Sequence, residues 1–430
     1  MKKVFPLVLV IAMVLSCYML ISGRIESKKE YESYLEQART LASQGVVVRS
    51  AEAYDNALLI KDDFEIAYEK AEMYYNNDYV SAAISYGEEL ITLYPKTAKA
   101  YEFLLKVYYD LQEYEDFFEV MKTVNKRKLQ SEEIDKMYTE IQYVYETGFS
   151  DYVEVYNCSG NFWVACKEDK MYGYLDAYGR NDIGFKYAQA KPFALNSAGV
   201  QEPNGDWYYI DVNGDKTNAP VLDTAIQDIG ILDSKVAIKT NNKYGYYSDS
   251  YKYLFGSYDY AGAFNNGVAP VKEGNTWAII NEKGEKVSSS AISDIPVDDK
   301  GVAFRNDRGF VAIDGKYNLI DSKCNKICEQ TFDSAKAFLS ADPAAVKVGS
   351  KWGFVNTAGE TVVEPTYEDA HSFVNGLAAV CKDGKWGFID KTNKVCIDFQ
   401  FDDVCDFNNY GVTFVKVDDV WTSLSVFSKM

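Results

Sequence analysis

A Lys-Trp-Gly element recurs through the last two-thirds of this chain at a spacing that few folds can satisfy. Trp352 and Trp386 carry it in full, 34 residues apart. Trp or Tyr occupies the same repeat position at intervals of 33 to 40 residues, at Tyr172, Trp207, Tyr244, Trp277, Tyr317, Trp352, Trp386 and Trp421. A repeat of this length indicates a tandem array of small structural units, each packed on its neighbours.

Other positions keep the same register. A Phe follows the aromatic anchor by 21 residues in four units, at Phe193, Phe338, Phe373 and Phe407. Short alternating runs are separated by tight turns such as residues 211–214 and 390–393, in which Asp begins the turn and Gly or Asn supplies positive φ. Each unit is therefore expected to be a β-hairpin with a third strand, and residues 151–430 are expected to be all-β.

A sheet of three or four strands cannot bury both of its faces alone. Radial stacking of neighbouring sheets covers those faces and leaves only short edges. The Trp and Phe positions are expected to form the core between units, and the Gly after Trp lets another backbone approach closely. The first unit lacks a leading strand and the last stops soon after Trp421, so the two ends are expected to meet. We predict a closed β-propeller of seven or eight blades, with an open β-solenoid as the alternative.

The segment Gly-Lys-Trp-Gly-Phe-Ile-Asp at 384–390, preceded by Gly-x-Ala-x-Val, resembles the bacterial WG (KWG) repeat family. The resemblance covers residues 151–430 and is strongest at 345–407. It weakens at 172–210 and at 301–330, where Asn318 replaces the Gly after the anchor. The resemblance implies a β-propeller, often fused to helical repeats or a membrane segment. It implies no particular activity, because the molecular function of the family is mostly unassigned.

Residues 25–150 have apolar positions at helical period and almost no Gly or Pro. Aromatic residues recur in this region at Tyr34, Tyr68 and Tyr101. The pattern is typical of helix–turn–helix repeats and resembles the tetratricopeptide repeat over about three units, although Glu72 stands where that family prefers Gly. A generic stack of α-hairpins is the alternative. A last helix is expected from Ser131, a favourable N-cap, to Tyr145.

Residues 4–22 are uncharged and apolar, and Lys2 and Lys3 precede them. A helix of this length reaches about 28 Å, which nearly spans a hydrocarbon core of about 30 Å. We predict a retained signal-anchor at residues 1–24 that crosses the cell membrane once and leaves the bulk of the chain outside the cytoplasm. A cleaved signal peptide, which would want a shorter apolar core, is one alternative. A lipoprotein signal at Cys17 is another, although the apolar run continues beyond that residue.

No catalytic, cofactor-binding or metal-binding set of residues is predicted. His371 is the only histidine, and its repeat position holds other residues in sister units: Lys191, Lys336 and Cys405. We interpret it as a variable residue on the exposed rim, because a lone histidine without partners is seldom functional. A residue that the fold requires recurs in its position, so a true site residue should depart from the repeat.

Three further candidates have structural interpretations. Residues 211–215 faintly resemble a calcium loop but fall in the hairpin-turn position. The acidic pairs at 368–369 and 402–403 invite comparison with glycosidases, yet they occupy equivalent positions of successive repeats. No Cys-x-x-Cys pair occurs, and Cys324 with Cys328 is the only local pair that invites a test for a disulfide.

The net charge of −19 argues against a nucleic-acid partner. We predict a non-catalytic, membrane-anchored binding or scaffold protein at the bacterial cell surface, without a cofactor. Its helical repeats would dock a protein, and its propeller would recognise an extracytoplasmic protein or cell-wall glycan. One alternative is a cell-wall glycan-acting enzyme that uses carboxylates on the propeller face. Another is a scaffold facing the cytoplasm, if the anchor inserts the other way.

Overall fold

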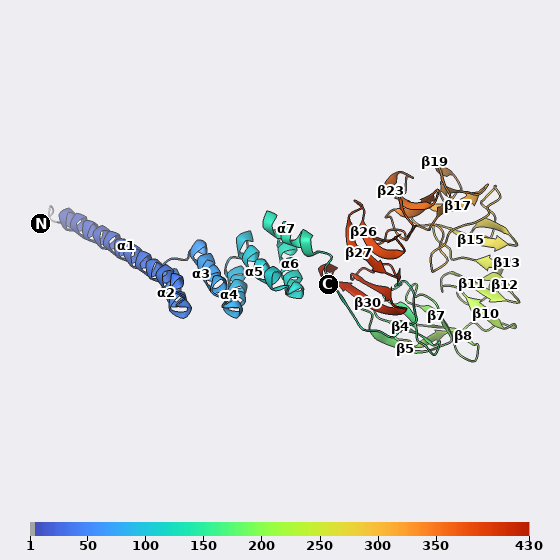
Figure 1. The fold of residues 1–430 in the computed structure, drawn as a ribbon, viewed down its shortest axis with the longest axis horizontal. Helices are drawn as coiled ribbons and strands as arrows, with labels where there is room; N and C mark the ends of the chain where they lie inside the picture. The colour runs from blue at the N-terminus through green and yellow to red at the C-terminus, as the bar shows by residue number, and fades with distance from the viewer. Residues whose placement is uncertain (1–4, 430) are drawn as a thin grey trace. The chain divides into compact units, whose positions relative to one another are not determined.

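The chain forms two compact units, residues 1–142 and 143–430. In a computed structural model, the backbone is described over residues 5–429, and the side chains over residues 24–217 and 219–428. The first unit is helical and the second is a ring of β-sheets (Figure 1).

Seven helices lie in the described part of the first unit: α1 (Phe5–Ser43), α2 (Val47–Ile60), α3 (Phe64–Asn76), α4 (Val80–Leu93), α5 (Ala98–Leu111), α6 (Tyr114–Arg127) and α7 (Glu132–Ile141). Consecutive helices from α1 to α6 contact one another, and α5 also contacts α3 and α7. This is the contact pattern of α-hairpins stacked side by side. The closer resemblance to the tetratricopeptide repeat stays a prediction.

The recurring aromatic residues fall at corresponding places in this stack. Tyr34, Tyr68 and Tyr101 lie in α1, α3 and α5, the first helices of successive pairs. Small residues sit where the helices approach one another, and Ala71 and Ala83 are fully buried. A side chain larger than methyl at these positions would push the paired helices apart.

Among the described residues of this unit, two helices have an N-cap side chain that accepts a backbone N–H, and both caps are short polar residues. Asp63 accepts the backbone N–H of Glu65 at 3.2 Å, and Ser131 Oγ accepts that of Ile134 at 3.2 Å. The predicted start of the last helix is therefore confirmed. Its predicted end at Tyr145 is wrong, because α7 stops at Ile141 and Tyr145 begins a strand of the second unit.

The helix α1 packs on α2 through its C-terminal half, where Leu35 and Ala38 are buried. Among the residues whose side chains are described, no helix is both long enough and apolar enough to cross a membrane. The predicted anchor at residues 1–24 lies almost entirely outside those residues and stays a prediction.

The described residues of the second unit form eight sheets, numbered here as blades in chain order. Blade 1 consists of β2 (Glu154–Val155), β3 (Trp163–Cys166), β4 (Tyr172–Leu175) and β5 (Asn181–Tyr187). Blade 2 consists of β6 (Gln189–Ala190), β7 (Ala198–Gln201), β8 (Trp207–Ile210) and β9 (Lys216–Asn218). Blade 3 consists of β10 (Ile226–Ile229), β11 (Lys235–Thr240), β12 (Lys243–Ser248) and β13 (Tyr253–Tyr258). Blades 4 and 5 are β14 (Tyr260–Ala261), β15 (Val268–Glu273) and β16 (Thr276–Asn281); and β17 (Gly309–Ile313), β18 (Lys316–Ile320) and β19 (Lys326–Phe332). Blade 5 also has an isolated bridge between Asp294 and Ala312 in place of its first strand.

The remaining three blades have four strands each. Blades 6 and 7 are β20 (Ser334–Ala335), β21 (Ala344–Val348), β22 (Lys351–Val355) and β23 (Thr361–Tyr367); and β24 (Asp369–Ala370), β25 (Leu377–Lys382), β26 (Lys385–Asp390) and β27 (Val395–Phe401). Blade 8 is β28 (Asp403–Val404), β29 (Val412–Val417), β30 (Val420–Val426) and β1 (Tyr145–Thr147).

The last blade takes its fourth strand from the other end of the unit. β1 pairs with β30 in antiparallel register, with Tyr145 opposite Val426 and Thr147 opposite Leu424. This pairing confirms the predicted meeting of the two ends and sets the number of blades at eight. It excludes the open β-solenoid, because the chain closes on itself.

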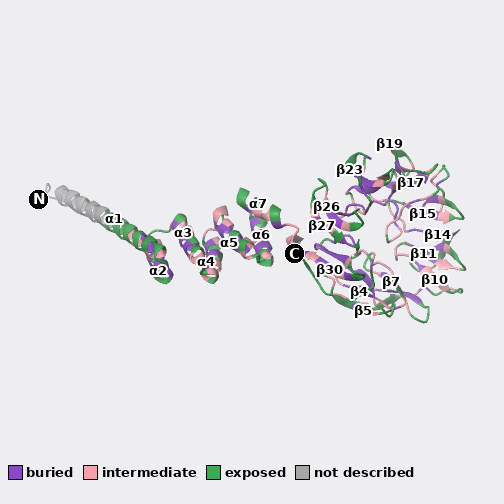
Figure 2. Ribbon diagram, in the orientation of Figure 1, coloured by how far each residue is buried: buried purple, intermediate pink, exposed green. Residues whose placement is uncertain are grey.

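The core lies between blades. Each of the eight blade boundaries, including that between blades 8 and 1, holds a cluster of buried apolar residues from both neighbours. Figure 2 shows buried residues along the strands of the ring. The recurring Phe residues are part of these clusters and are almost fully buried: Phe193, Phe338, Phe373 and Phe407. The inter-blade role predicted for the Phe position is confirmed.

The aromatic anchors are less uniform than predicted. Trp207, Trp352 and Trp421 are buried, whereas the other five anchors are only partly buried. The three Tyr anchors instead donate their hydroxyl to an acidic residue on the first strand or bridge of their own blade, in the pairs Tyr172–Glu154 at 3.0 Å, Tyr244–Asp228 at 2.6 Å and Tyr317–Asp294 at 2.6 Å. Tyr thus replaces Trp as the anchor where a carboxylate can accept a hydrogen bond from its hydroxyl group.

The Gly after the anchor has the role predicted for it. A Cβ at Gly353 would lie 2.5 Å from the Val363 carbonyl oxygen, and one at Gly387 would lie 2.7 Å from that of Ile397. Both contacts are to the backbone of the fourth strand, beside an irregularity in the strand register. Only glycine lets the two backbones come this close.

Candidate functional site

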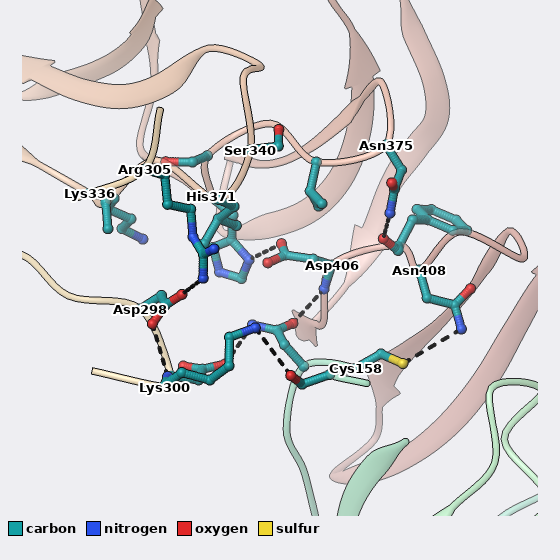
Figure 3. Close-up of a pocket in the computed structure, with 18 of the residues that line it drawn as sticks. Cys158, Asp298, Lys300, Arg305, Lys336, Ser340, His371, Asn375, Asp406 and Asn408 are labelled. Atoms are coloured by element: carbon teal, nitrogen blue, oxygen red, sulfur yellow. Dashed lines mark hydrogen bonds and ion pairs between the residues drawn. The ribbon is translucent and has the colours of Figure 1, made fainter. Parts of the chain in front are cut away.

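A cavity of about 660 Å³ lies in the propeller. It is lined by the segments that follow the first strand of blades 1, 5, 6, 7 and 8: residues 157–161, 296–300 with Arg305, 335–340, 371–375 and 406–409. Only at the axis of a closed ring can segments from five blades meet. We call this space the larger axial cavity (Figure 3).

A second cavity of about 180 Å³ is lined by the remaining blades. Its walls come from blades 2, 3 and 4, around Lys191, Asp228 and Gly262, together with residues 298–301 of blade 5. Residues 298–300 line both cavities, so a segment of blade 5 separates the two spaces.

That segment is an insertion in the repeat. Phe373 follows Asp369 by four positions in blade 7, whereas Phe304 follows the equivalent Asp294 by ten positions in blade 5. The equivalence follows from pairing, because Phe373 precedes the bridge Val374–Leu377 and Phe304 precedes the bridge Arg305–Arg308. The extra residues form what we call the cross-axis loop, residues 296–301.

The cross-axis loop is bonded to the opposite side of the ring. Asn157 Nδ2 donates to Asp299 Oδ2 at 3.1 Å, and Lys300 Nζ donates to Ser159 Oγ at 3.1 Å. Asn157 and Ser159 belong to blade 1, which faces blade 5 in a ring of eight. A backbone bond from the Ala263 N–H to the Gly301 carbonyl oxygen at 2.9 Å ties the loop to blade 4. The loop therefore crosses the axis.

Asp298 holds the loop in shape. One of its oxygens accepts the backbone N–H of Lys300 and that of Val302, both at 2.9 Å. Its other oxygen forms an ion pair with Arg305 Nη2. With its carboxylate fully engaged and its side chain almost completely covered, Asp298 acts as a structural residue of the loop.

His371 lies in the larger axial cavity, so its interpretation as an exposed rim residue is wrong. Its Nδ1 is 2.8 Å from Asp406 Oδ1, and its ring packs on Trp386 with centroids 4.9 Å apart. Figure 3 shows the imidazole and the Asp406 carboxylate facing each other. The position looks variable in sequence because different side chains occupy it in sister units, Lys191, Lys336 and Cys405.

Cations at this position share one arrangement. Lys191 lies over Trp207 and Lys336 over Trp352, with Nζ 5.6 and 5.2 Å from the ring centroids. Each lysine also reaches a carboxylate of the next blade: Lys191 pairs with Asp228 at 2.8 Å, and Lys336 pairs with Asp369 at 3.0 Å. The Trp anchors thus support a set of inter-blade ion pairs around the axis.

Asp299 is the carboxylate of the larger axial cavity whose pKa is raised by its surroundings. Its carboxylate is open to the cavity yet surrounded by protein, and this partial loss of solvent raises its pKa above the usual value. The hydrogen bond from Asn157 opposes that rise, and the charges of Asp406 and Asp298 add to it. Enclosure also raises the pKa of the Cys158 thiol, to about 11, so this cysteine is a neutral thiol and a poor nucleophile at pH 7.

The arrangement offers hydrogen bonds and charges of both signs to a ligand. Across the described residues, no group of three or more His, Cys, Asp and Glu side chains is placed to hold a metal ion. The cavity wall carries Asn, Ser and Lys side chains beside the carboxylates, together with apolar residues such as Leu339 and Val374. Recognition of a polar molecule is the chemistry that this set supports directly.

The other residues singled out from the sequence have turn roles. Asp211 Oδ1 accepts the backbone N–H of Asn213 at 2.9 Å and that of Asp215 at 3.0 Å, which accounts for the calcium-like pattern. Glu368 accepts the backbone N–H of Gly384 at 2.9 Å, across the hairpin of blade 7. In blade 8, Asp402 accepts the backbone N–H of Asp418 at 3.0 Å.

The seven cysteines whose side chains are described are free thiols, Cys324 and Cys328 among them. Both lie in or next to β19 of blade 5, away from the residues that line the two axial cavities. They therefore contribute nothing to the candidate site.

Sequence reasoning missed the residues at the centre of the site, Asp299 and Lys300. One signal for them was present, because the interval of 40 residues between Trp277 and Tyr317 is the longest in the array. The sequence thus showed that residues were inserted in this unit, but it did not show that they cross the axis of the ring.

Comparison with solved structures finds other propeller-sized chains of low identity. BamB from Moraxella catarrhalis is 13% identical, with a TM-score of 0.43 over 65% of this chain and 97% of that one. Kluyveromyces lactis Hsv2 is 11% identical, with a TM-score of 0.35 over 65% and 98%, and YCF48 bound to D1 peptide is 13% identical, with a TM-score of 0.35 over 66% and 96%. Comparison with curated proteins finds no match.

A family model described as the WG containing repeat matches residues 257–277, 352–386 and 386–421. The last two matches run from one Trp anchor to the next, and the first ends on the anchor Trp277. They identify the C-terminal region as an array of WG repeats, consistent with a protein of the WG-repeat family.

Proposed function

We propose that this chain is a non-catalytic, membrane-anchored binding or scaffold protein whose propeller recognises a ligand in the larger axial cavity. The observation that carries the proposal is the cavity itself, whose volume of about 660 Å³ lies within the range of about 300–1,000 Å³ found for small-molecule sites. Its walls include residues found once in the ring, such as Asp299 and Lys300 of the cross-axis loop, beside core residues of the repeat such as Phe407.

The hydrogen bonding of the cavity favours binding over catalysis. The His371 ring is held by Asp406, and no hydroxyl or thiol among the described side chains bonds to it. Ser159 Oγ donates to the Phe193 carbonyl oxygen at 2.6 Å, and Cys158 is a neutral thiol. A nucleophile with an adjacent base, which covalent catalysis requires, is therefore not assembled among these residues.

The helical unit and the apolar N-terminal segment complete the proposal. A stack of α-hairpins exposes an extended surface of the kind that helical repeat proteins use to dock other proteins. The apolar run at 4–22 is long enough to anchor the chain, with the lysines before it on the cytoplasmic side. The propeller would then face the cell wall or the medium, where its ligand is a protein, a peptide or a glycan.

The binding proposal is tested by blocking the larger axial cavity. Peptides and cell-wall glycan fragments are screened for a rise in the melting temperature of the purified full chain. Ser340→Trp places a large side chain on the cavity wall and is expected to abolish the rise, whereas Ser290→Trp, on an exposed loop, leaves it intact. A rise that Ser340→Trp leaves unchanged would place the ligand elsewhere and refute the proposal.

The proposed location is tested on intact cells. Protease added from outside is expected to digest the propeller while a cytoplasmic marker survives. Survival of the propeller on intact cells, followed by digestion after lysis, would refute the exported orientation and favour a scaffold facing the cytoplasm.

One observation favours the second candidate, a cell-wall glycan-acting enzyme. Asp299 and Asp406 share the larger axial cavity, and the raised pKa of Asp299 suits a general acid. Incubation with peptidoglycan fragments is expected to yield no new reducing ends. Turnover by the wild-type chain that Asp299→Asn abolishes would establish the enzyme in place of the binding protein.

A further inference from the structure

Two neighbouring residues of the cross-axis loop carry opposite charges without pairing to each other. Asp299 is bonded to the amide of Asn157, and Lys300 to the hydroxyl of Ser159. Both partners are neutral. Among the described side chains, no ion pair joins Asp299 or Lys300 to any residue within 4.0 Å.

The other ionisable side chains of the larger axial cavity each have an ionisable partner. Asp298 pairs with Arg305, and His371 faces Asp406 at 2.8 Å. Lys336 pairs with Asp369 of the next blade at 3.0 Å. Asp299 and Lys300 are thus the two charges of this cavity that remain for a ligand.

The surroundings of Asp299 favour a cation beside it. Asp406 and Asp298 both act on its carboxylate with a like charge, and His371 opposes them only when protonated. An ammonium group beside the carboxylate would relieve that repulsion and replace the solvent lost on enclosure. Lys300, next in the chain, offers an ammonium to a carboxylate of the same ligand.

We propose that the larger axial cavity binds a zwitterion, an amino acid or short peptide whose free ammonium group contacts Asp299 and whose free carboxylate contacts Lys300. The assignment rests on the proposed function of this cavity as a ligand site. It deepens that function by naming the chemical class of the ligand. The cross-axis loop then has a purpose, because it carries both charges to the middle of the ring on adjacent residues.

Other ligand classes fit less well. A neutral sugar would displace water from Asp299 and Lys300 without offering either an opposite charge. A phosphate would match Lys300 but would lie beside the carboxylate of Asp299, which has no ion-pair partner among the described side chains and would repel it.

The test is calorimetric titration of the purified full chain with L-alanyl-L-alanine. Its N-acetylated form lacks the ammonium group, and its amide form lacks the carboxylate. Chitobiose and inorganic phosphate represent the neutral and anionic classes. We expect one site for the free dipeptide, at least tenfold weaker binding of each capped form, and no binding of chitobiose or phosphate.

Two isosteric variants assign the charges. Asp299→Asn is expected to abolish the preference for the free amine while keeping that for the free carboxylate, and Lys300→Gln is expected to do the reverse. Asp314→Asn and Lys323→Gln remove charges from exposed turns of the same blade and should behave as wild type. Circular dichroism and melting temperature establish that each variant is folded.

The outcomes separate the two proposals. Equal affinity for free and capped dipeptides, or no binding of the free dipeptide at all, overturns the zwitterion assignment. Chitobiose or phosphate that binds and is blocked by Ser340→Trp overturns it too, while the function of the cavity as a ligand site stands. Dipeptide binding that survives Ser340→Trp overturns both.

Discussion

Blades 5 and 7 are built on the same repeat, but only blade 5 carries an insertion that reaches the axis of the ring. Blade 7 follows the repeat throughout, and its short connection from β24 to Phe373 turns directly into β25. Blade 5 inserts six residues at that point, yet Phe304 returns to the buried position that Phe373 occupies. The comparison teaches that the repeat tolerates change where the chain faces the axis and resists it where two blades pack together.

The two blades also differ at the residue after the anchor. In blade 7, Gly387 lies beside a register irregularity that brings β27 close. In blade 5, Asn318 pairs directly with Thr331, and the irregularity comes later, between Asn318 and Ile320. The Gly of the motif is thus needed only where the bulge lies next to it.

The largest expected effect tests whether the Phe position has the same core role in blade 5 as in blade 7. Phe373→Ala and Phe304→Ala each remove an aromatic ring that is 0% and 1% exposed, respectively. Each should lower the free energy of unfolding by about 3–5 kcal/mol, as for other buried Phe residues. Chemical denaturation of both variants checks this. A loss below about 1 kcal/mol for Phe304→Ala alone would show that blade 5 does not rebuild the core of blade 7.

A smaller effect on stability is expected at the residue that follows the anchor, and it should differ between the two blades. Gly387→Ala places a Cβ 2.7 Å from a backbone oxygen and should cost about 1–3 kcal/mol of stability. Asn318→Ala, at the equivalent position of blade 5, should change stability by less than about 0.5 kcal/mol. Urea titration of the pair measures the difference, and similar losses for both would contradict the account of the motif Gly.

The cross-axis loop is expected to respond to a change on the opposite blade. Asn157→Ala removes the hydrogen bond to Asp299 and the acceptor of the Asp406 N–H at 2.7 Å, which should cost about 1–2 kcal/mol. Hydrogen exchange should speed up at residues 296–301 and stay unchanged in the short connection of blade 7. Unchanged exchange in the loop would mean that blade 1 does not hold it.

The smallest effects concern pH, and they have opposite signs. The folded pKa of Asp299 is raised above its ordinary value of 3.8, so the folded chain binds this proton more tightly than the unfolded chain. Its contribution to stability is therefore largest below pH 3.8 and falls as the pH rises through the raised pKa. The stability of Asp299→Asn relative to wild type should rise over that window, as measured by denaturation at a series of pH values.

Asp402 provides the contrast from a regular blade. The hydrogen bond from Lys385 holds its pKa below 3.8, so its contribution is present above that value and is lost as the pH falls through the lowered pKa. Asp402→Asn should therefore lose stability relative to wild type as the pH rises toward 4. Slopes of the same sign for the two variants would contradict the assigned environments.

Much of the fold could be predicted because the relevant contacts repeat. The anchor, the Phe position and the turn residues each make the same local contact in several blades, so their periodicity in the sequence reports their structural role. The meeting of the two ends was also predictable, because an incomplete first unit and an incomplete last one indicate a shared blade. These features were determined by the sequence alone.

The candidate site depended on the tertiary structure. The bonds from Asn157 to Asp299 and from Lys300 to Ser159 join residues 142 and 141 positions apart, and each occurs once. A contact that occurs once leaves no period to detect, and the axis of the ring is where such contacts collect. For the same reason, His371 looked like a variable rim residue in sequence and lies in the cavity in space. The sequence determined the blades and their closure, and only the closed ring decided which departures from the repeat face one another.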